Sequence, residues 1–208
     1  MSANSEEGTE EESGAHPWHV SLLVPGQKEP FCAGTLISDR HVLTAAHCTH
    51  DKGPKDFVAV MGDHDWDSKN DADTMDVECV KNHMSYDPIL MDFDIAMLTL
   101  SKNVDFGSGK RPACLPRSTN FKDRGMKDRF FTASGWGSKR TQDGYPISLN
   151  SVDLEYVKWH DCRRINKWKQ RKISWRTFCS ADGPNEDVCS CSGDGGGTYL
   201  SGYHYCLK

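Results

Sequence analysis

The chain has 208 residues, of which 37% are hydrophobic and 26% are charged, and this combination is typical of a folded protein with a buried core rather than a disordered one. Its formal net charge of -5 excludes a general attraction to nucleic acid, whose phosphates require a basic surface. No apolar run approaches the roughly 20 residues needed to span a bilayer, so no association with a membrane is predicted.

The first residues of the chain are small and acidic. Residues 1–14 read MSANSEEGTEEESG and lack the apolar segment of a secretory signal peptide. We expect residues 1–14 to form a mobile N-terminal arm and residues 15–208 to form the folded domain.

Short apolar runs begin at Trp18 and continue along most of the chain. They are WHVSLLV, GTLIS, HVLTAA, FVAVMG, DIAMLTL and FTASGWG, and loops such as DWDSKNDAD and SKRTQDGYP separate them. Runs of this length and spacing predict the strands of an all-β sandwich or barrel. One segment, VKWHDCRRINKWKQRK, predicts a helix instead, because its apolar residues recur every three positions along one side.

Three stretches contain the residue types of a Ser-His-Asp hydrolase. LTAAHC places His47 after an apolar strand, DFDIAMLTL places Asp94 at the head of another, and SGDGGG forms a glycine-rich turn. Such an enzyme needs an imidazole that takes the serine proton and a buried carboxylate that orients the imidazole. It also needs backbone N–H groups directed at the developing oxyanion, and small residues allow this.

The order of these stretches resembles that of the chymotrypsin-like serine protease family. PWHVSLL, FCAGTLIS, VLTAAHC, DIAMLTL, ACLP, ASGWG, FCSA and SGDGGG follow the family's order across nearly the whole chain. The resemblance implies an all-β fold of two packed antiparallel Greek-key β-barrels, with the active site between them and one short helix. Because the chain stops at GYHYCLK, soon after the glycine turn, we expect the second barrel to be incomplete at its C-terminus.

The resemblance assigns a role to five residues. His47 matches the general base and Asp94 the carboxylate that orients it. Gly193 matches the glycine of the oxyanion hole, and Asp194 matches the buried acid of the nucleophile loop. Gly195 stands where the family has its nucleophilic serine. Because glycine has no side chain, no acyl-enzyme can form at this position.

The expected activation site also departs from the family. Ser5 and Glu6 stand in place of the Ile-Val pair at the mature N-terminus, and Asn4 replaces the basic cleavage residue. No new ammonium group is then available to Asp194, and a buried carboxylate without a partner is costly. We therefore expect Asp194 to turn outward, as in a zymogen.

The residues next to Gly195 in the glycine turn are not expected to replace the missing nucleophile. Ser190 and Ser192 lie on other parts of a constrained turn and are poor substitutes for the nucleophile. Cys189 matches the floor of the primary specificity pocket, where a trypsin-like enzyme has aspartate. A preference for Lys or Arg is therefore not predicted.

Nine cysteines favour an oxidising compartment, and the family implies a secreted, extracellular protein, although this chain has no signal peptide. The resemblance implies the disulfides Cys32–Cys48 and Cys162–Cys179. Cys79 and Cys114 either pair or stay free, and Cys191 has Cys206 or Cys189 as alternative partners. A different hypothesis makes zinc ligands of the soft side chains near the end of the chain, namely Cys179, Cys189, Cys191, His204 and Cys206.

Two surface segments have ligand-binding interpretations. The loop GDHDWDSKNDAD resembles the family's calcium loop, with ligands Asp63, Asn70 and Asp73, and its alternative is a solvated acidic loop. The resemblance implies no other cofactor. The basic run from Arg163 to Arg176 predicts an exosite for an anionic glycan, and its alternative is a solvated helix face.

The sequence therefore predicts a catalytically inactive serine protease homologue that acts, if at all, by binding protein or peptide ligands. The alternative is an active serine endopeptidase in which Gly195 is a substitution or an error. A second alternative is a partial gene product without a function of its own.

Overall fold

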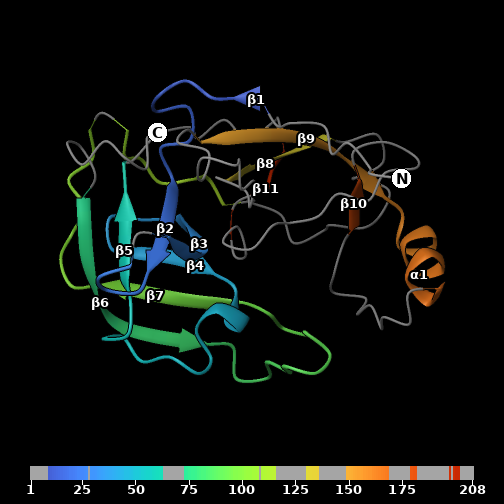
Figure 1. The fold of residues 1–208 in the computed structure, drawn as a ribbon, viewed down its shortest axis with the longest axis horizontal. Helices are drawn as coiled ribbons and strands as arrows, with labels where there is room; N and C mark the ends of the chain where they lie inside the picture. The colour runs from blue at the N-terminus through green and yellow to red at the C-terminus, as the bar shows by residue number, and fades with distance from the viewer. Residues whose placement is uncertain are drawn as a thin grey trace.

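Six strands close into a barrel in the order β2-β3-β4-β7-β6-β5 (Figure 1). The structure is a computed structural model and describes residues 9–27, 29–62, 73–107, 109–115, 130–135, 149–168, 179–181, 197 and 199–201. The strands of the barrel are β2 (His19–Leu23), β3 (Pro30–Leu36), β4 (His41–Thr44), β5 (Val58–Met61), β6 (Asp73–Asn82) and β7 (Ala96–Leu100). All neighbouring strands are antiparallel, and closure removes the free strand edges.

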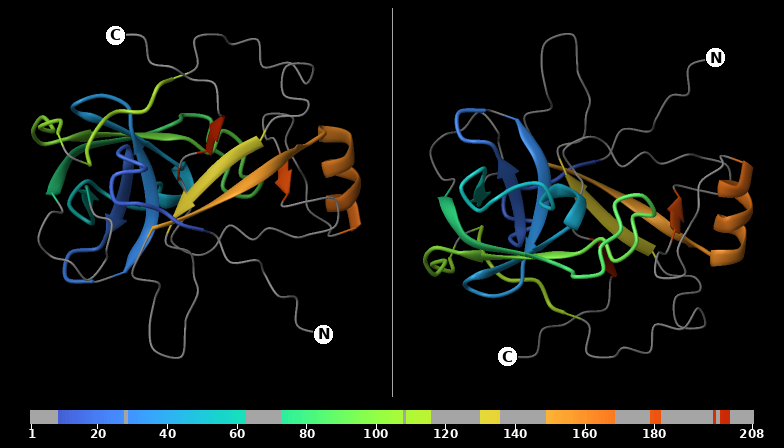
Figure 2. Two further views of the ribbon diagram at one scale, coloured as in Figure 1. Left: turned by 90° about the horizontal axis from the view of Figure 1, so that it is seen from above. Right: turned by 90° about the horizontal axis from the view of Figure 1, so that it is seen from below.

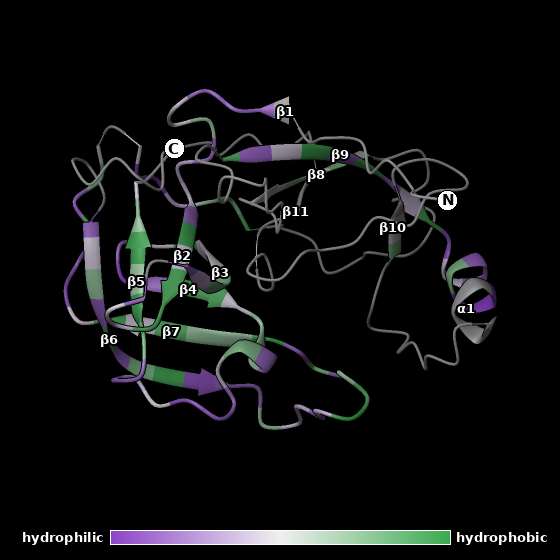
Figure 3. Ribbon diagram, in the orientation of Figure 1, coloured by the Kyte–Doolittle hydropathy of each residue, from purple (hydrophilic) through white to green (hydrophobic). Residues whose placement is uncertain are grey.

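The interior of this barrel is filled by aliphatic side chains that alternate along the strands. Val20 and Leu22 of β2 and Leu98 and Leu100 of β7 are completely buried. They lie two positions apart because successive side chains of a strand point to opposite faces. Figure 3 shows hydrophobic residues along β2, β5 and β7 and more polar ones along β6. The barrel is therefore a rigid platform for the residues at its strand ends.

A second antiparallel sheet lies beside the barrel. It has the order β1-β9-β8-β11, with β10 paired to β9. Its strands are β1 (Thr9–Glu10), β8 (Phe130–Gly135), β9 (Asn150–Val157), β10 (Cys179–Ala181) and β11 (Tyr199–Ser201). Over the described residues this sheet stays open, in agreement with the expected partial second barrel.

Part of the segment assigned to the N-terminal arm belongs to this second sheet. Thr9 and Glu10 form β1 and pair with Ser151 and Asn150 of β9. The backbone N–H of Glu11 donates to the Leu149 carbonyl oxygen over 2.9 Å. Residues 9–11 are thus held by backbone hydrogen bonds, while residues 1–8 lie outside the described residues.

The predicted helix is α1 (Trp159–Trp168), which follows β9 directly. Figure 2 shows α1 at the end of the second sheet that points away from the first barrel. Cys162, which is buried, forms a disulfide with Cys179 of β10 and so ties the helix to the sheet. In the part of the chain that the structure describes, no helix is both long enough and apolar enough to cross a membrane.

Candidate functional site

His47 lies in a short 3-10 helix, η1 (Ala46–Cys48), that follows β4. Its two neighbours in η1 are buried, with Ala46 0% and Cys48 2% exposed. The turn therefore directs the intervening side chain outward, and 34% of the His47 side chain is exposed. The imidazole stands at the end of the barrel with its backbone anchored in the core.

The pairing of β4 with β7 brings Asp94 to His47. Thr44, the last residue of β4, lies opposite Ala96, the first residue of β7. Because the two strands are antiparallel, the residues just after Thr44 meet the residues just before Ala96. Asp94 consequently lies beside η1, although 47 residues separate it from His47 along the chain.

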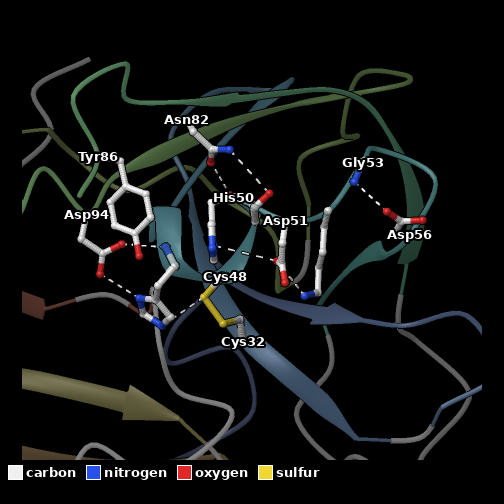
Figure 4. Close-up of polar contacts among 12 residues, drawn as sticks. Cys32, Cys48, His50, Asp51, Gly53, Asp56, Asn82, Tyr86 and Asp94 are labelled. Carbon is white, nitrogen blue, oxygen red and sulfur yellow. Dashed lines mark hydrogen bonds and ion pairs between the residues drawn. A yellow bond between two sulfur atoms is a disulfide. The ribbon is translucent and has the colours of Figure 1, made fainter. Parts of the chain in front are cut away.

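Both carboxylate oxygens of Asp94 bind His47, as the dashed lines at Asp94 in Figure 4 show. Oδ1 accepts the backbone N–H of His47 over 2.7 Å. Oδ2 lies 2.7 Å from the ring nitrogen Nδ1, which donates to it. Two contacts to one residue hold the imidazole in position and assign the proton to Nδ1.

This contact shifts the pKa of both groups. The hydrogen bond from Asp94 raises the pKa of His47, burial opposes this in part, and the charge of Asp94 adds to the increase. Burial by itself would raise the pKa of Asp94. The hydrogen bonds and charge of His47 outweigh burial, so the pKa of Asp94 lies below its ordinary value. The arrangement favours a carboxylate that stabilises a protonated imidazole, as a general base requires.

The structure brings together two of the predicted site residues, His47 and Asp94. Cys189, Gly193, Asp194 and Gly195 lie outside the described residues, so their roles stay predictions.

The predicted disulfides Cys32–Cys48 and Cys162–Cys179 are both confirmed. Cys79 is a free, exposed thiol, whereas Cys114 is disulfide-bonded. Of the alternatives that the sequence left open for these two residues, the Cys79–Cys114 pair does not form, and only Cys79 stays free.

The predicted calcium ligands are only partly described. Asp63 and Asn70 lie outside the described residues. The carboxylate of Asp73, in β6, binds the ammonium of Lys110, whose side chain is 14% exposed. A cation of the chain itself therefore already neutralises Asp73, and calcium binding stays a prediction.

The basic run is described only at its start. Arg163 lies 5.2 Å from the Trp159 ring, and Arg164, whose side chain is 75% exposed, lies 3.6 Å from Asp161. The residues from 169 to 176 lie outside the described part, so an anionic glycan also stays a prediction.

Sequence reasoning missed the segment that surrounds Asp94. Tyr86 lies beside Asp94 in Figure 4, and its hydroxyl donates to the sulfur of Met91 over 3.4 Å. Partial burial raises the pKa of Tyr86, and the nearby carboxylates, Asp94 first among them, add to this increase. Tyr86 gave no sequence signal because it stands outside the motifs that contain His47 and Asp94.

The same segment exposes several large apolar side chains. We call residues 84–95 the apolar loop. Five of the large hydrophobic side chains that are exposed in the described structure belong to it, namely Met84 (96%), Ile89 (90%), Met91 (48%), Ile95 (45%) and Leu90 (43%). Exposed apolar patches of this kind mark interaction sites in soluble proteins. The apolar loop contains Asp94 and so borders the His47–Asp94 pair.

Comparison with known proteins agrees with this geometry. The model of the family described as Trypsin matches residues 6–206. The chain is 32% identical to CLIP domain-containing serine protease B15 of Anopheles gambiae, over 93% of this chain and 57% of that protein. It is 29% identical to ovochymase-2 of Mus musculus and 27% identical to mannan-binding lectin serine protease 1 of Rattus norvegicus, over 93% of this chain in both cases. It spans 31% and 29% of those two proteins, so it matches only part of each relative.

Proposed function

The chain belongs to the trypsin family of serine proteases, and from this premise we propose that it is a catalytically inactive homologue that binds protein or peptide segments without hydrolysing them. The observation that carries the proposal is Gly195 in the turn SGDGGG, where the family has its serine. His47 then has a carboxylate that orients it, but position 195 supplies no serine hydroxyl for it to deprotonate. In an unrelated enzyme of this type, loss of the serine costs about 10⁶ in kcat, or roughly 8 kcal/mol of barrier.

The apolar loop supports binding as the remaining activity. Ile89 and Met84 expose nearly their whole side chains to water, and burial of one such side chain contributes about 1.5–3 kcal/mol. An extended peptide segment with apolar side chains, lying along this loop beside His47, would cover them. Such a protein would act as a decoy, an adaptor or a competitor for inhibitors of active relatives. The disulfides Cys32–Cys48 and Cys162–Cys179 support a secreted, extracellular protein.

One observation favours a second candidate function, an active serine endopeptidase. The His47–Asp94 pair keeps both 2.7 Å contacts, which a protein without catalysis does not need. In this alternative Gly195 replaces a serine of the natural protein.

A peptidase assay separates the two candidates. We expect the purified wild-type chain to give no hydrolysis of a fluorogenic protein substrate above that of its His47→Ala variant. Turnover by the wild type that His47→Ala abolishes would contradict the proposal. A gain-of-function variant tests whether the remaining machinery works. Gly195→Ser, combined with a cleavable N-terminus that begins Ile-Val at positions 5 and 6, gives turnover if the second candidate is correct, and its silence would exclude that candidate.

A retention assay tests binding itself. Peptides from a proteome digest are passed over the immobilised protein, and the retained ones are identified by mass spectrometry. We expect Ile89→Asp to lower the affinity for the retained peptides about 10-fold or more, because the substitution places a charge in the apolar contact. Phe106→Asp is the matched control, since Phe106 is 50% exposed but lies outside the apolar loop. Equal retention by both variants would show that the apolar loop is not the binding surface.

A further inference from the structure

Two of the large side chains that the apolar loop exposes are methionines. Met84 is 96% and Met91 48% exposed, and both belong to the surface that the proposed function uses for binding. We propose that Met84 and Met91 are modification sites, and that their oxidation to methionine sulfoxide by a hydroperoxide switches the apolar loop from a binding to a non-binding state. The inference rests on the proposed function, since it describes how the same surface is regulated.

The oxidation consumes one hydroperoxide for each methionine. The sulfur donates an electron pair to the terminal oxygen of the hydroperoxide, the O–O bond breaks, and an S–O bond forms. The proton of the transferred oxygen moves to the leaving oxygen, so the second product is an alcohol, or water when the oxidant is hydrogen peroxide. The sulfur loses two electrons and the hydroperoxide gains them. A flexible apolar side chain thereby becomes a polar one, which disrupts methionine-rich contacts.

The barrel protects the methionines of its core from this reaction. Met61 in β5 is 1% exposed and Met75 in β6 is 4% exposed, and both belong to the hydrophobic core. A hydroperoxide dissolved in water reaches an exposed sulfur far more easily than one enclosed in a close-packed interior. Oxidation of the folded protein therefore alters the apolar loop and leaves intact the core on which His47 stands.

Tyr86 makes the two sides of the Met91 sulfur unequal. Its hydroxyl donates to this sulfur over 3.4 Å, and its ring makes an edge contact with the ring of His50, with the centroids 5.5 Å apart. A thioether sulfur has two lone pairs, and addition of oxygen to one or the other gives opposite epimers of the sulfoxide. Because the hydroxyl occupies one lone pair, a hydroperoxide meets the other. We therefore expect one epimer to predominate at Met91 and an even mixture at the almost fully exposed Met84.

The distance between Met91 and Tyr86 leaves no room for a new oxygen on that side. An O–H···O hydrogen bond by itself needs about 2.5–3.0 Å between its oxygens. The sulfur and the hydroxyl oxygen are 3.4 Å apart, so the remainder is shorter than a covalent bond. The contact thus shields this side of the sulfur as long as the loop keeps its conformation.

The test compares the wild type with a variant that combines Met84→Leu and Met91→Leu. Leucine is apolar, similar in volume to methionine and unbranched at Cβ, so the variant keeps an apolar loop without sulfur. Both proteins are treated with hydrogen peroxide, which is then removed. Binding is measured with a fluorescent, methionine-free peptide whose sequence comes from the retention assay. We expect treatment to weaken binding by the wild type about 10-fold or more and to leave binding by the variant unchanged.

The leucine variant is also the matched control for other oxidation, because it keeps Cys79, the exposed free thiol, and every other oxidisable side chain. Mass spectrometry of the digested proteins reports the chemistry independently of binding. We expect sulfoxide at Met84 and Met91 while Met61 and Met75 remain thioethers. The two classes of methionine sulfoxide reductase, each specific for one epimer, then report the epimer ratio at Met91. Tyr86→Phe, which keeps the ring and removes the hydroxyl, should make this ratio even.

Several results would overturn the inference. Unchanged binding by wild type that mass spectrometry shows to be oxidised at Met84 and Met91 would show that the sulfoxides do not control the surface. An equal loss of binding in the leucine variant would place the effect at another side chain. Sulfoxide at Met61 and Met75 as early as in the apolar loop would refute the selectivity, and an even epimer ratio at Met91 would refute the role of Tyr86. If the untreated wild type retains no peptide, the proposed function itself is wrong and the inference falls with it.

Discussion

The burial of His19 where the barrel meets the second sheet predicts that the stability of the protein depends on pH. It lies in β2 of the first barrel and is 5% exposed, and its Nδ1 is 3.5 Å from the hydroxyl of Ser134 in β8 of the second sheet. Burial, with a smaller contribution from His16, lowers the pKa of His19 from 6.5 to about 4. The folded protein therefore keeps this imidazole neutral at pH values at which an exposed histidine is charged.

The direction of the effect on stability follows from this difference. Between about pH 6.5 and about pH 4 the unfolded chain binds a proton at His19 that the folded protein does not. The free energy of unfolding therefore falls as the pH drops through this window. The loss reaches about 2 kcal/mol near pH 5 and about 3 kcal/mol at the lower end. Since whole domains are stable by about 5–15 kcal/mol, this single group has a large effect.

Urea unfolding of the wild type and of His19→Gln, followed from about pH 7.5 to about pH 4, measures this contribution. Glutamine does not titrate, and groups that are not coupled to His19 contribute equally to both proteins; the coupling to His16 is the smaller cause of the shift. We expect the stability of the wild type relative to the variant to fall by about 3 kcal/mol over this range. A stability difference that stays constant with pH would refute the reasoning, because His19 would then titrate alike in the folded and unfolded chains.

Three further predictions concern the site and the core. Asp94→Asn removes the charge that supports the His47 imidazolium and leaves at most a weaker, neutral hydrogen bond, so the pKa of His47 should fall. An NMR titration of the His47 ring protons measures this, and an unchanged pKa would show that the contact does not form. Leu98→Ala, at a completely buried position, should lower the free energy of unfolding in urea by about 2–5 kcal/mol. Met84→Ala, at an exposed position, should change the free energy of unfolding by less than about 0.5 kcal/mol. Equal losses for Leu98→Ala and Met84→Ala would contradict the assignment of the core. Met91 has a φ of 52°, so Met91→Asn should raise the thermal midpoint by relieving about 1 kcal/mol of strain, whereas Met84→Asn should not.

Apolar runs in the sequence predicted some of the helices and strands of this fold and not others. The runs WHVSLLV and DIAMLTL appear as β2 and β7, and the helix predicted over 157–172 is confirmed over Trp159–Trp168. The long strands β6 and β9 were not predicted, since neither is an apolar run. In β6, Met75 and Val77 are buried while Asp76 and Glu78 between and beside them are exposed. Alternation, rather than apolar content, was the signal available for these strands.

The sequence by itself determined the family, the strands made of apolar runs and both predicted disulfides. Each depends on residues close together in the chain or on motifs whose order the family shares. Only the tertiary structure decided the contacts between distant segments. The antiparallel pairing of β4 with β7 sets Asp94 2.7 Å from His47, and the packing of the second sheet against the barrel brings Ser134 to His19. The pKa of His47 follows from a carboxylate 47 residues away, and the pKa of His19 follows mainly from burial, neither of which a local pattern contains.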